Sequence, residues 1–193
     1  HLAQFADMGT VYMRAMYGYE SPRVGLVSIG EEASKGSSLI QEAHALLKQD
    51  ESINFAGNIE GRDVVSGNYQ VAVTDGFTGN NMLKLMEGTI SMMFDIVRSS
   101  AEGSLRGRLG GALLLPTLRE ARLRLDYRRY GAVPLLGVNG EVFIGHGRSD
   151  AEAVANAVRG AAEVDRHGVL DELRKAIAAR YRPVTDELET PDA

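Results

Sequence analysis

Apolar and polar positions follow one repeated order through the first half of the chain. Three times, a strand-like apolar run is followed by a polar loop that contains glycine and then by a helical pattern. The apolar runs are "RVGLVSIG", "SINFAG" and "YQVAV". Strands that alternate with helices are typical of βαβ units and a mostly parallel sheet. The sequence therefore predicts an α/β fold, with the three polar loops at the carboxyl ends of the strands, where ligands gather.

Helical periodicity appears before this repeat and again after its third strand. Residues 1–18 predict an amphipathic helix with an apolar face formed by Leu2, Phe5, Met8, Tyr12 and Met16. A second apolar stripe at three- and four-residue spacing is formed by Met82, Met86, Ile90, Met93, Phe94 and Val97. We expect this stripe to lie on a long helix.

The pattern changes in the glycine-rich segment "SSAEGSLRGRLGGALLLP", where the long helix fades. A second helical stretch from about Thr117 to Arg129 predicts a protruding helical hairpin over about 80–130. Two short strands should then flank Asn139-Gly140, a dipeptide suited to a type I′ turn. Two further helical patterns complete a single domain over 1–185, and 186–193 reads as a disordered polar tail.

Composition narrows the chemistry. With 193 residues, 44% of them apolar, the chain is long enough to bury a core. The absence of cysteine excludes thiolate nucleophiles and cysteine-ligated metal sites. The net charge of −5 gives no support for nucleic-acid binding, although the segment between Ala101 and Tyr130 contains seven arginines and only three acidic residues. No cluster of residues placed as metal ligands is apparent, so we expect neither a metal nor another cofactor.

The first two polar loops each contain a candidate anion ligand. In "GEEASKG", Glu31 and Lys35 precede a helix, and a lysine beside a helix N-terminus favours anions. The alternative is a solvated loop with a serine helix cap. In "EGRD", Arg62 has the fork geometry for a phosphate or carboxylate, but the pattern favours pairing with Glu60 or Asp63.

The third loop, "DGFTGN", is the most informative. Gly79 lets a ligand approach the backbone, Thr78 and Asn80 offer hydrogen bonds, and Asp75 ends the strand at the crevice. These features suit a phosphoryl group or an oxyanion, although the same residues also suit a turn and helix cap. His146, between two glycines, is a weaker candidate acid–base group. The sequence contains no G-x-S-x-G, H-E-x-x-H, P-loop or G-x-G-x-x-G motif.

The segment between the two helical stretches combines leucines with arginines. Leu105, Leu109 and Leu113 lie among glycines beside Arg106 and Arg108, which suits contact with an anionic membrane surface. Packing of the same leucines in a dimer or in the core explains the pattern equally well.

Five ordered motifs together resemble one family, the bacterial acyl-carrier-protein–phosphate acyltransferases of phospholipid synthesis, called PlsX. The motifs are "SPRVGLVSIGEEASKG", "INFAGNIEGRD", "VAVTDGFTGNNMLKLMEG", "YGAVPLLGVNG" and "HGRSDA". The resemblance covers nearly the whole chain apart from the acidic tail. It implies transfer of a fatty acyl group from acyl carrier protein to inorganic phosphate, with the phosphate itself as nucleophile.

The resemblance also implies roles for the loop residues. Lys35 would hold phosphate or polarise the thioester, Asn80 would donate to phosphate or oxyanion, and His146 would be a weaker catalytic member. Thr78 and Gly79 would contact the substrate. The residues that orient them would be Glu31, Arg62 and Asp75.

The implied fold is the three-layer α/β/α sandwich of isocitrate and isopropylmalate dehydrogenases. The implied protein is a cytoplasmic homodimer, and the hairpin tip from Gly103 to Leu115 would bring it to the inner face of the cell membrane. Arg122 and Arg124 would dock the acidic carrier protein.

The chain departs from the family in one respect, because the family's glycine-rich amino-terminal half has no counterpart here. We therefore expect the 193-residue chain to be inactive alone. Two functional alternatives stay open: a phosphotransacetylase-like enzyme that uses acyl-CoA, and a non-catalytic membrane-associated dimer scaffold. A dehydrogenase of the same broad fold is less consistent with the lack of metal-ligand aspartates.

Overall fold

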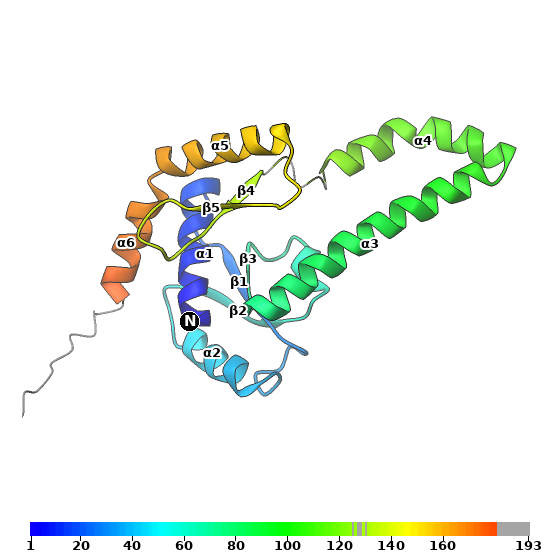
Figure 1. Cartoon of the computed structure of the whole chain (residues 1–193). Helices are drawn as coiled ribbons and strands as arrows, with labels where there is room; N and C mark the ends of the chain where they lie inside the picture. Colours follow the sequence, from blue (N-terminus) through cyan, green and yellow to red (C-terminus); the bar gives the residue numbers. More distant parts are fainter. Residues whose placement is uncertain (125, 127–128, 130, 181–193) are drawn as a thin grey trace, which may run out of the picture.

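The computed structural model describes residues 1–124, 126, 129 and 131–180, and the predicted tail lies outside them. Its elements, shown in Figure 1, are α1 (Leu2–Tyr17), β1 (Arg23–Val27), α2 (Ser38–Lys48), β2 (Asn54–Ile59), the 3₁₀ turn η1 (Asp63–Val65), β3 (Val71–Val73), α3 (Gly76–Glu102), α4 (Leu105–Arg124), β4 (Ala132–Pro134), β5 (Phe143–Gly145), α5 (Ala151–Arg166) and α6 (Val169–Arg180). The α/β class predicted from the alternation of patterns is confirmed.

The first three strands form one parallel sheet in the order β2-β1-β3. Val24 in β1 is paired with Phe55 on one side and with Val71 on the other. The strands therefore point the same way, and their carboxyl ends meet at one edge of the sheet. This arrangement confirms the predicted parallel pairing, with one correction: the second unit contains only the turn η1 where a helix was expected.

One face of this sheet carries the main core. Alternate strand residues pack there against α1 and α2, and the cluster comprises Leu2, Ala6, Val24, Leu26, Ile40, Ala43, Leu47, Ile53, Val71 and Val73. Because side chains alternate along a strand, Val27 and Ala72 belong to the opposite face. Ala72 is exposed. The described residues thus place a helical layer, α1 with α2, over one face of the sheet (Figure 1).

The predicted single apolar face of the first helix is wrong, because α1 lies between two clusters. Leu2 belongs to the sheet core, whereas Met8, Tyr12 and Met16 pack against a second cluster centred on α6. Phe5 is 45% exposed. A helix packed on two sides needs apolar residues over a wider arc than a one-sided amphipathic helix, so one stripe does not describe it.

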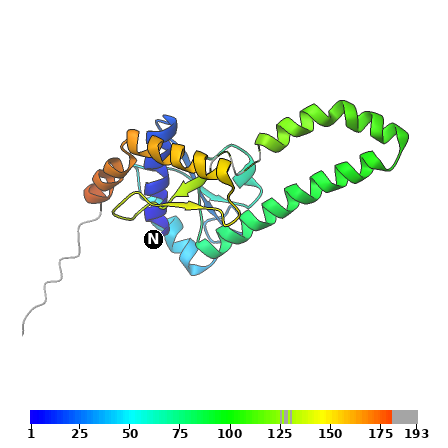
Figure 2. The same ribbon diagram turned by 45° about the horizontal axis from the view of Figure 1, so that its top comes forward.

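The helical hairpin is confirmed, with different bounds. It projects from the body of the molecule in both ribbon views (Figures 1 and 2). The glycine-rich segment expected to form its tip is helical, and the turn is confined to Gly103 and Ser104. A Cβ on Gly111 would lie 2.8 Å from the Ala101 Cβ, and one on Gly107 would lie 2.7 Å from the Ala101 oxygen. These glycines permit the close approach of α4 to α3.

The apolar stripe of α3 is not part of the core. No residue of this helix is buried, and Met93 is 58% exposed. None of the described helices is both long and apolar enough to cross a bilayer.

The strand pair after the hairpin is confirmed, but its connection differs from the prediction. β4 and β5 are antiparallel, and residues 135–142 separate them. The positive φ in this connection falls at Gly137, and neither Asn139 nor Gly140 adopts one. A type I′ turn requires positive φ at both central residues, so Asn139-Gly140 does not form it.

Candidate anion-binding site

The segments that leave β1, β2 and β3 meet at the carboxyl edge of the sheet. Ser28, the first residue after β1, donates its backbone N–H to the Ile59 carbonyl at the end of β2, with an N···O distance of 2.8 Å. The three polar loops predicted from the sequence therefore begin from neighbouring points. The geometry of each loop decides which of its groups remain available to a ligand.

A buried hydrogen-bond network fixes the first loop. The Asn58 side-chain nitrogen donates to the Glu32 carbonyl over 2.8 Å. The Asn58 oxygen consequently faces the His44 ring, whose Nδ1 lies 2.9 Å away and acts as the donor. Asn58 is 5% exposed and His44 is 9% exposed. The sequence analysis missed both residues, and the only signal was a polar residue in an otherwise apolar strand end.

A close glycine contact also shapes this loop. Gly36 has a φ of +91°, and a Cβ there would lie 2.9 Å from Ile40 Cβ and from Ser28 Oγ. Only glycine adopts this conformation without strain. Ser37 occupies the N-cap position of α2, but its side chain makes no capping hydrogen bond. The serine cap considered for this loop is therefore absent.

Arg62 in the second loop is surrounded by carboxylates. Its guanidinium lies 2.6 Å from Glu60, 3.5 Å from Glu31 and 4.0 Å from Asp63. The contact with Glu31 links the second loop to the first. Arg62 is thus engaged by acidic partners on both loops, as the pairing alternative predicted, and it acts in this arrangement as a bridge.

Asp75 in the third loop caps α3. Its carboxylate accepts hydrogen bonds from the Thr78 hydroxyl at 2.6 Å and from the Thr78 backbone N–H at 2.9 Å. These bonds, led by that of the hydroxyl, lower the pKa of Asp75 below its ordinary value. The Gly79 N–H donates to the Asp75 carbonyl. The N–H groups of Thr78 and Gly79 therefore already have partners within the loop.

Several polar groups near this edge have no partner among the described residues, and four of them concern the candidate site. Two are exposed side chains, the Lys35 ammonium and the Asn80 carboxamide. The other two, Ser28 Oγ and Thr74 Oγ1, are shielded from solvent, and both follow directly after a strand. A shielded hydroxyl without a partner is uncommon in folded proteins. The two hydroxyls were not singled out in the sequence.

His146 lies apart from these loops. It lines a cavity of about 580 Å³ together with Phe94 and Asp95 from α3, Arg122 from α4 and Arg148. The described residues that line this cavity include none from the three polar loops. The grouping of His146 with Lys35 and Asn80 therefore has no support in this arrangement.

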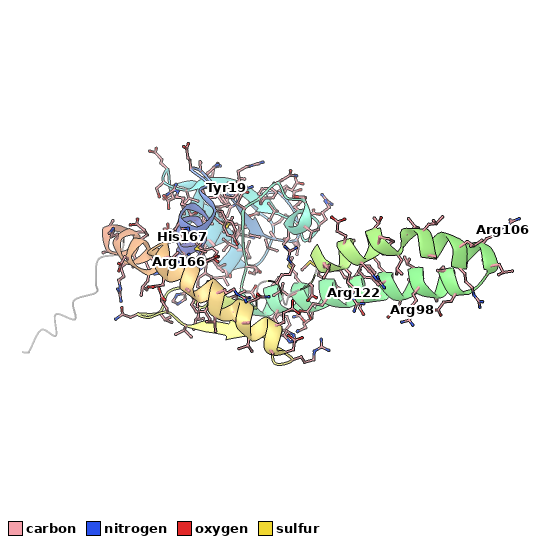
Figure 3. All side chains as sticks on the ribbon, turned by 90° about the horizontal axis from the view of Figure 1, so that it is seen from above. Tyr19, Arg98, Arg106, Arg122, Arg166 and His167 are labelled. Atoms are coloured by element: carbon pink, nitrogen blue, oxygen red, sulfur yellow. The ribbon has the colours of Figure 1, made fainter. Side chains whose placement is uncertain are left out.

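The candidate leucines and arginines of the hairpin are distributed along its length. Leu105, Leu109 and Leu113 follow one another at four-residue spacing on α4, and they are 79%, 70% and 84% exposed. Arg106 lies at the far end of the hairpin and Arg122 lies closer to the body (Figure 3). The Arg124 side chain lies outside the described residues.

No group of three or more metal-ligand side chains occurs in the described ranges. Of the two basic side chains in these loops, Arg62 is engaged by carboxylates, and Lys35 has no partner among the described residues. Lys35 is therefore the cation of these loops that could hold an anion.

Comparison with known sequences places this chain in a family. Residues 1–172 match the family described as fatty acid synthesis protein. Three relatives of this chain are named phosphate acyltransferase. The protein from Thermus thermophilus is 47% identical to this chain over 93% of its residues, that from Synechococcus elongatus is 45% identical over 98%, and that from Halothermothrix orenii is 43% identical over 92%. These alignments cover 55%, 55% and 53% of the relatives, so the chain spans about half their length. The chain belongs to the fatty acid synthesis protein family.

Proposed function

We propose that this chain supplies one wall of the active site of a phosphate acyltransferase, which moves a fatty acyl group from acyl carrier protein to inorganic phosphate. The observation that carries the proposal is that the three polar loops start side by side at the carboxyl edge of the sheet, with the exposed Lys35 and Asn80 side chains lacking partners among the described residues. The names of the relatives support the reaction class.

The reaction forms one bond and breaks one bond. A phosphate oxygen attacks the thioester carbonyl carbon, the carbon–sulfur bond breaks, and the leaving thiolate takes a proton to give the carrier thiol. The enzyme must hold the phosphate in line with the carbonyl and stabilise the developing oxyanion. No covalent enzyme intermediate is needed, which agrees with a chain that contains no cysteine.

The available groups suggest a division of roles. Lys35 and Asn80 have donors without partners among the described residues, so we assign them to the phosphate and the oxyanion. Asp75 and Thr78 bond to each other and shape the start of α3. Glu31 and Arg62 join the first two loops and keep Lys35 in position. Gly79 accommodates the Thr74 methyl, from which an added Cβ would lie 2.9 Å, and we keep it as a proposed substrate contact. His146 remains a candidate proton donor only if the complete enzyme brings it closer.

A chimera tests this function. In it, the chain replaces the matching 180 residues of the Thermus thermophilus relative. We expect the chimera to form acyl phosphate, detected as the hydroxamate, faster from acyl carrier protein than from acyl-CoA. We expect no turnover by the 193-residue chain alone, because it spans about half of the relatives. A chimera that folds and uses neither donor would overturn the proposal, and a preference for acyl-CoA would favour the phosphotransacetylase-like reaction.

Point variants of the chimera test the residue roles. Lys35→Ala and Asn80→Ala should each lower kcat/KM by about 100-fold, as expected for the loss of one electrostatic contact to the transition state. Lys48→Ala and Asn68→Ala are matched controls, since both side chains are exposed and neither is among the residues proposed to contact the substrate. Wild-type turnover in both test variants would support the scaffold alternative.

We further propose that the hairpin mediates contact with the membrane and the carrier. The three exposed leucines of α4 lie beside Arg106 and Arg108, a combination that favours an anionic bilayer surface. Replacing the leucines with serine should abolish flotation with anionic vesicles. Arg122→Glu should slow the reaction with acyl carrier protein but not with acyl-CoA, and we extend the docking role to Arg124.

The same proposal includes a homodimer at the cytoplasmic face of the membrane and a three-layer α/β/α sandwich of the isocitrate dehydrogenase type. The helical layer of α1 and α2 supports the second point. Sedimentation of the chimera tests the first, and a monomer at working concentration would contradict it.

A further inference from the structure

An apolar cavity of about 510 Å³ lies next to the candidate anion site. Its apolar walls come from the end of β1, from the η1 segment and from the first half of α3, and they include Val27, Val64, Val65, Met82, Met86 and Ile90. The volume falls within the roughly 300–1,000 Å³ that is typical of small-molecule sites. The cavity also contains the first half of the α3 stripe that the core leaves uncovered.

Two threonines line the cavity, Thr74 beside the third polar loop and Thr89 further along α3. Thr74 and Gly79, both from the third polar loop region, line it, and Thr74 Oγ1 is the shielded hydroxyl without a partner among the described residues. Gly79 lies one residue from Thr78, the partner of Asp75. The apolar space therefore borders the third polar loop at Thr74 and Gly79, while the Thr74 hydroxyl itself is shielded.

We infer that this cavity binds the fatty acyl chain of the substrate, with the carbonyl at the Thr74 end and the methylenes along α3. The inference rests on the proposed function, because it assigns the acyl half of the same reaction. An unbranched acyl chain suits a space that begins beside the third polar loop and has mostly apolar walls along α3. Met82 and Met86 suit such a ligand, since methionine side chains adapt to variable apolar shapes.

The larger apolar cavity between α3 and α4 is a weaker candidate for this role. It measures about 770 Å³, but its described lining residues come only from the hairpin, from Phe94 to Arg122. A chain bound there would have no contact with the three polar loops. Of these two cavities, only the 510 Å³ one has lining residues from both the apolar α3 wall and the third polar loop.

Two ligand series test the acyl site on the 193-residue chain without requiring turnover. The first consists of n-alkyl phosphates from butyl to dodecyl, and the second of n-alkanols of the same lengths, each below its aggregation concentration. Calorimetric titration measures the affinities. Each buried methylene contributes about 0.8 kcal/mol, which is about fourfold in affinity. We expect this increment in both series until the chain fills the cavity.

A glycine pair supplies the test variant and its control. A Cβ on Gly61 would meet only the Met82 Cε, at 3.8 Å, so Gly61→Leu adds bulk to the cavity without a backbone clash. Gly88 also lies in exposed space, outside the lining, with nothing within 4 Å of an added Cβ. We expect Gly61→Leu to weaken dodecyl phosphate binding at least tenfold and to leave butyl phosphate unchanged. Gly88→Leu should change neither affinity.

The two series separate failure of the acyl site from failure of the phosphate site. Alkanol binding that depends on Gly61, with no gain from the phosphate group, would keep the acyl cavity and overturn the anion site. Phosphate binding without any dependence on chain length, or equal binding by Gly61→Leu and wild type, would overturn the acyl site. If a second copy of the chain fills this cavity, the chain will form concentration-dependent dimers and will not bind alkanols. That result would also overturn the acyl site.

Discussion

Replacing Asn58 with alanine should destabilise the fold and loosen the first loop together. The side chain is 5% exposed and bonds to the His44 ring and to the Glu32 carbonyl. Asn58→Ala leaves the buried His44 donor unsatisfied, at about 1–3 kcal/mol, and removes a second bond worth about 0.5–1.5 kcal/mol. The expected loss in the free energy of unfolding is therefore about 1.5–4.5 kcal/mol.

Urea unfolding measures this loss, and Asn54→Ala provides the control. Asn54 lies on the same strand and donates to the Ser21 carbonyl, but the bond is exposed, so its loss should cost at most about 1 kcal/mol. The denaturant slope should stay unchanged in both variants. Phosphate affinity should fall in Asn58→Ala and not in Asn54→Ala, because the Glu32 carbonyl bond holds the loop that contains Lys35.

Equal stability losses in the two variants would refute this reasoning, because they would mean that Asn58 is solvated like Asn54. A double variant with His44→Ala sharpens the test. Since the two side chains share a bond, the double variant should lose less stability than the sum of the single losses. Full additivity would show that the network does not act as a unit.

Three further changes have distinct expected outcomes. Gly36→Ala should cost about 2–5 kcal/mol, from a positive φ plus overpacking, whereas Gly57→Ala, at a similar φ but in open space, should cost about 1–2 kcal/mol in urea unfolding. Gly111→Leu should lower the thermal midpoint through its clash with α3, while Gly110→Leu, with open space around it, should not, and equal melting would contradict the close helix contact. Asp75→Ala should be most destabilising above pH 3.8, the ordinary pKa, and the difference in unfolding free energy from wild type should close as the pH falls through the lowered pKa of the folded state. A difference that stays constant from pH 7 to pH 3 would contradict this.

The parallel sheet and its loops were predictable because they depend on local patterns. Apolar runs of strand length followed by glycine-containing loops specify βαβ order, and the carboxyl ends of neighbouring strands then meet. The Asn58 network was not predictable in this way. A single asparagine at a strand end has no spacing signature, and its role follows from the tertiary approach of Glu32 and His44.

The hairpin shows why glycine content misled the prediction. Glycine is a poor helix former, so a glycine-rich segment reads as a loop on intrinsic preference alone. Gly107 and Gly111 are four residues apart and therefore share one face of α4. Their contacts with Ala101 show that the packing of two helices outweighs the local cost. The four-residue spacing was the signal that could have indicated a helix contact.

The α3 stripe shows a more general limit on reading function from periodicity. Met82, Met86 and Ile90 are spaced as core residues are, but none is buried in this chain, and all three line the cavity beside the third loop. Periodicity reports only that one face of a helix prefers an apolar neighbour, and it does not distinguish a protein core from a ligand. The stripe begins one turn after Thr78, so a ligand whose polar end lies at the loop would extend along the helix. One helix thereby joins the loop proposed to hold phosphate to an apolar path, as the proposed transfer of an acyl group to phosphate requires.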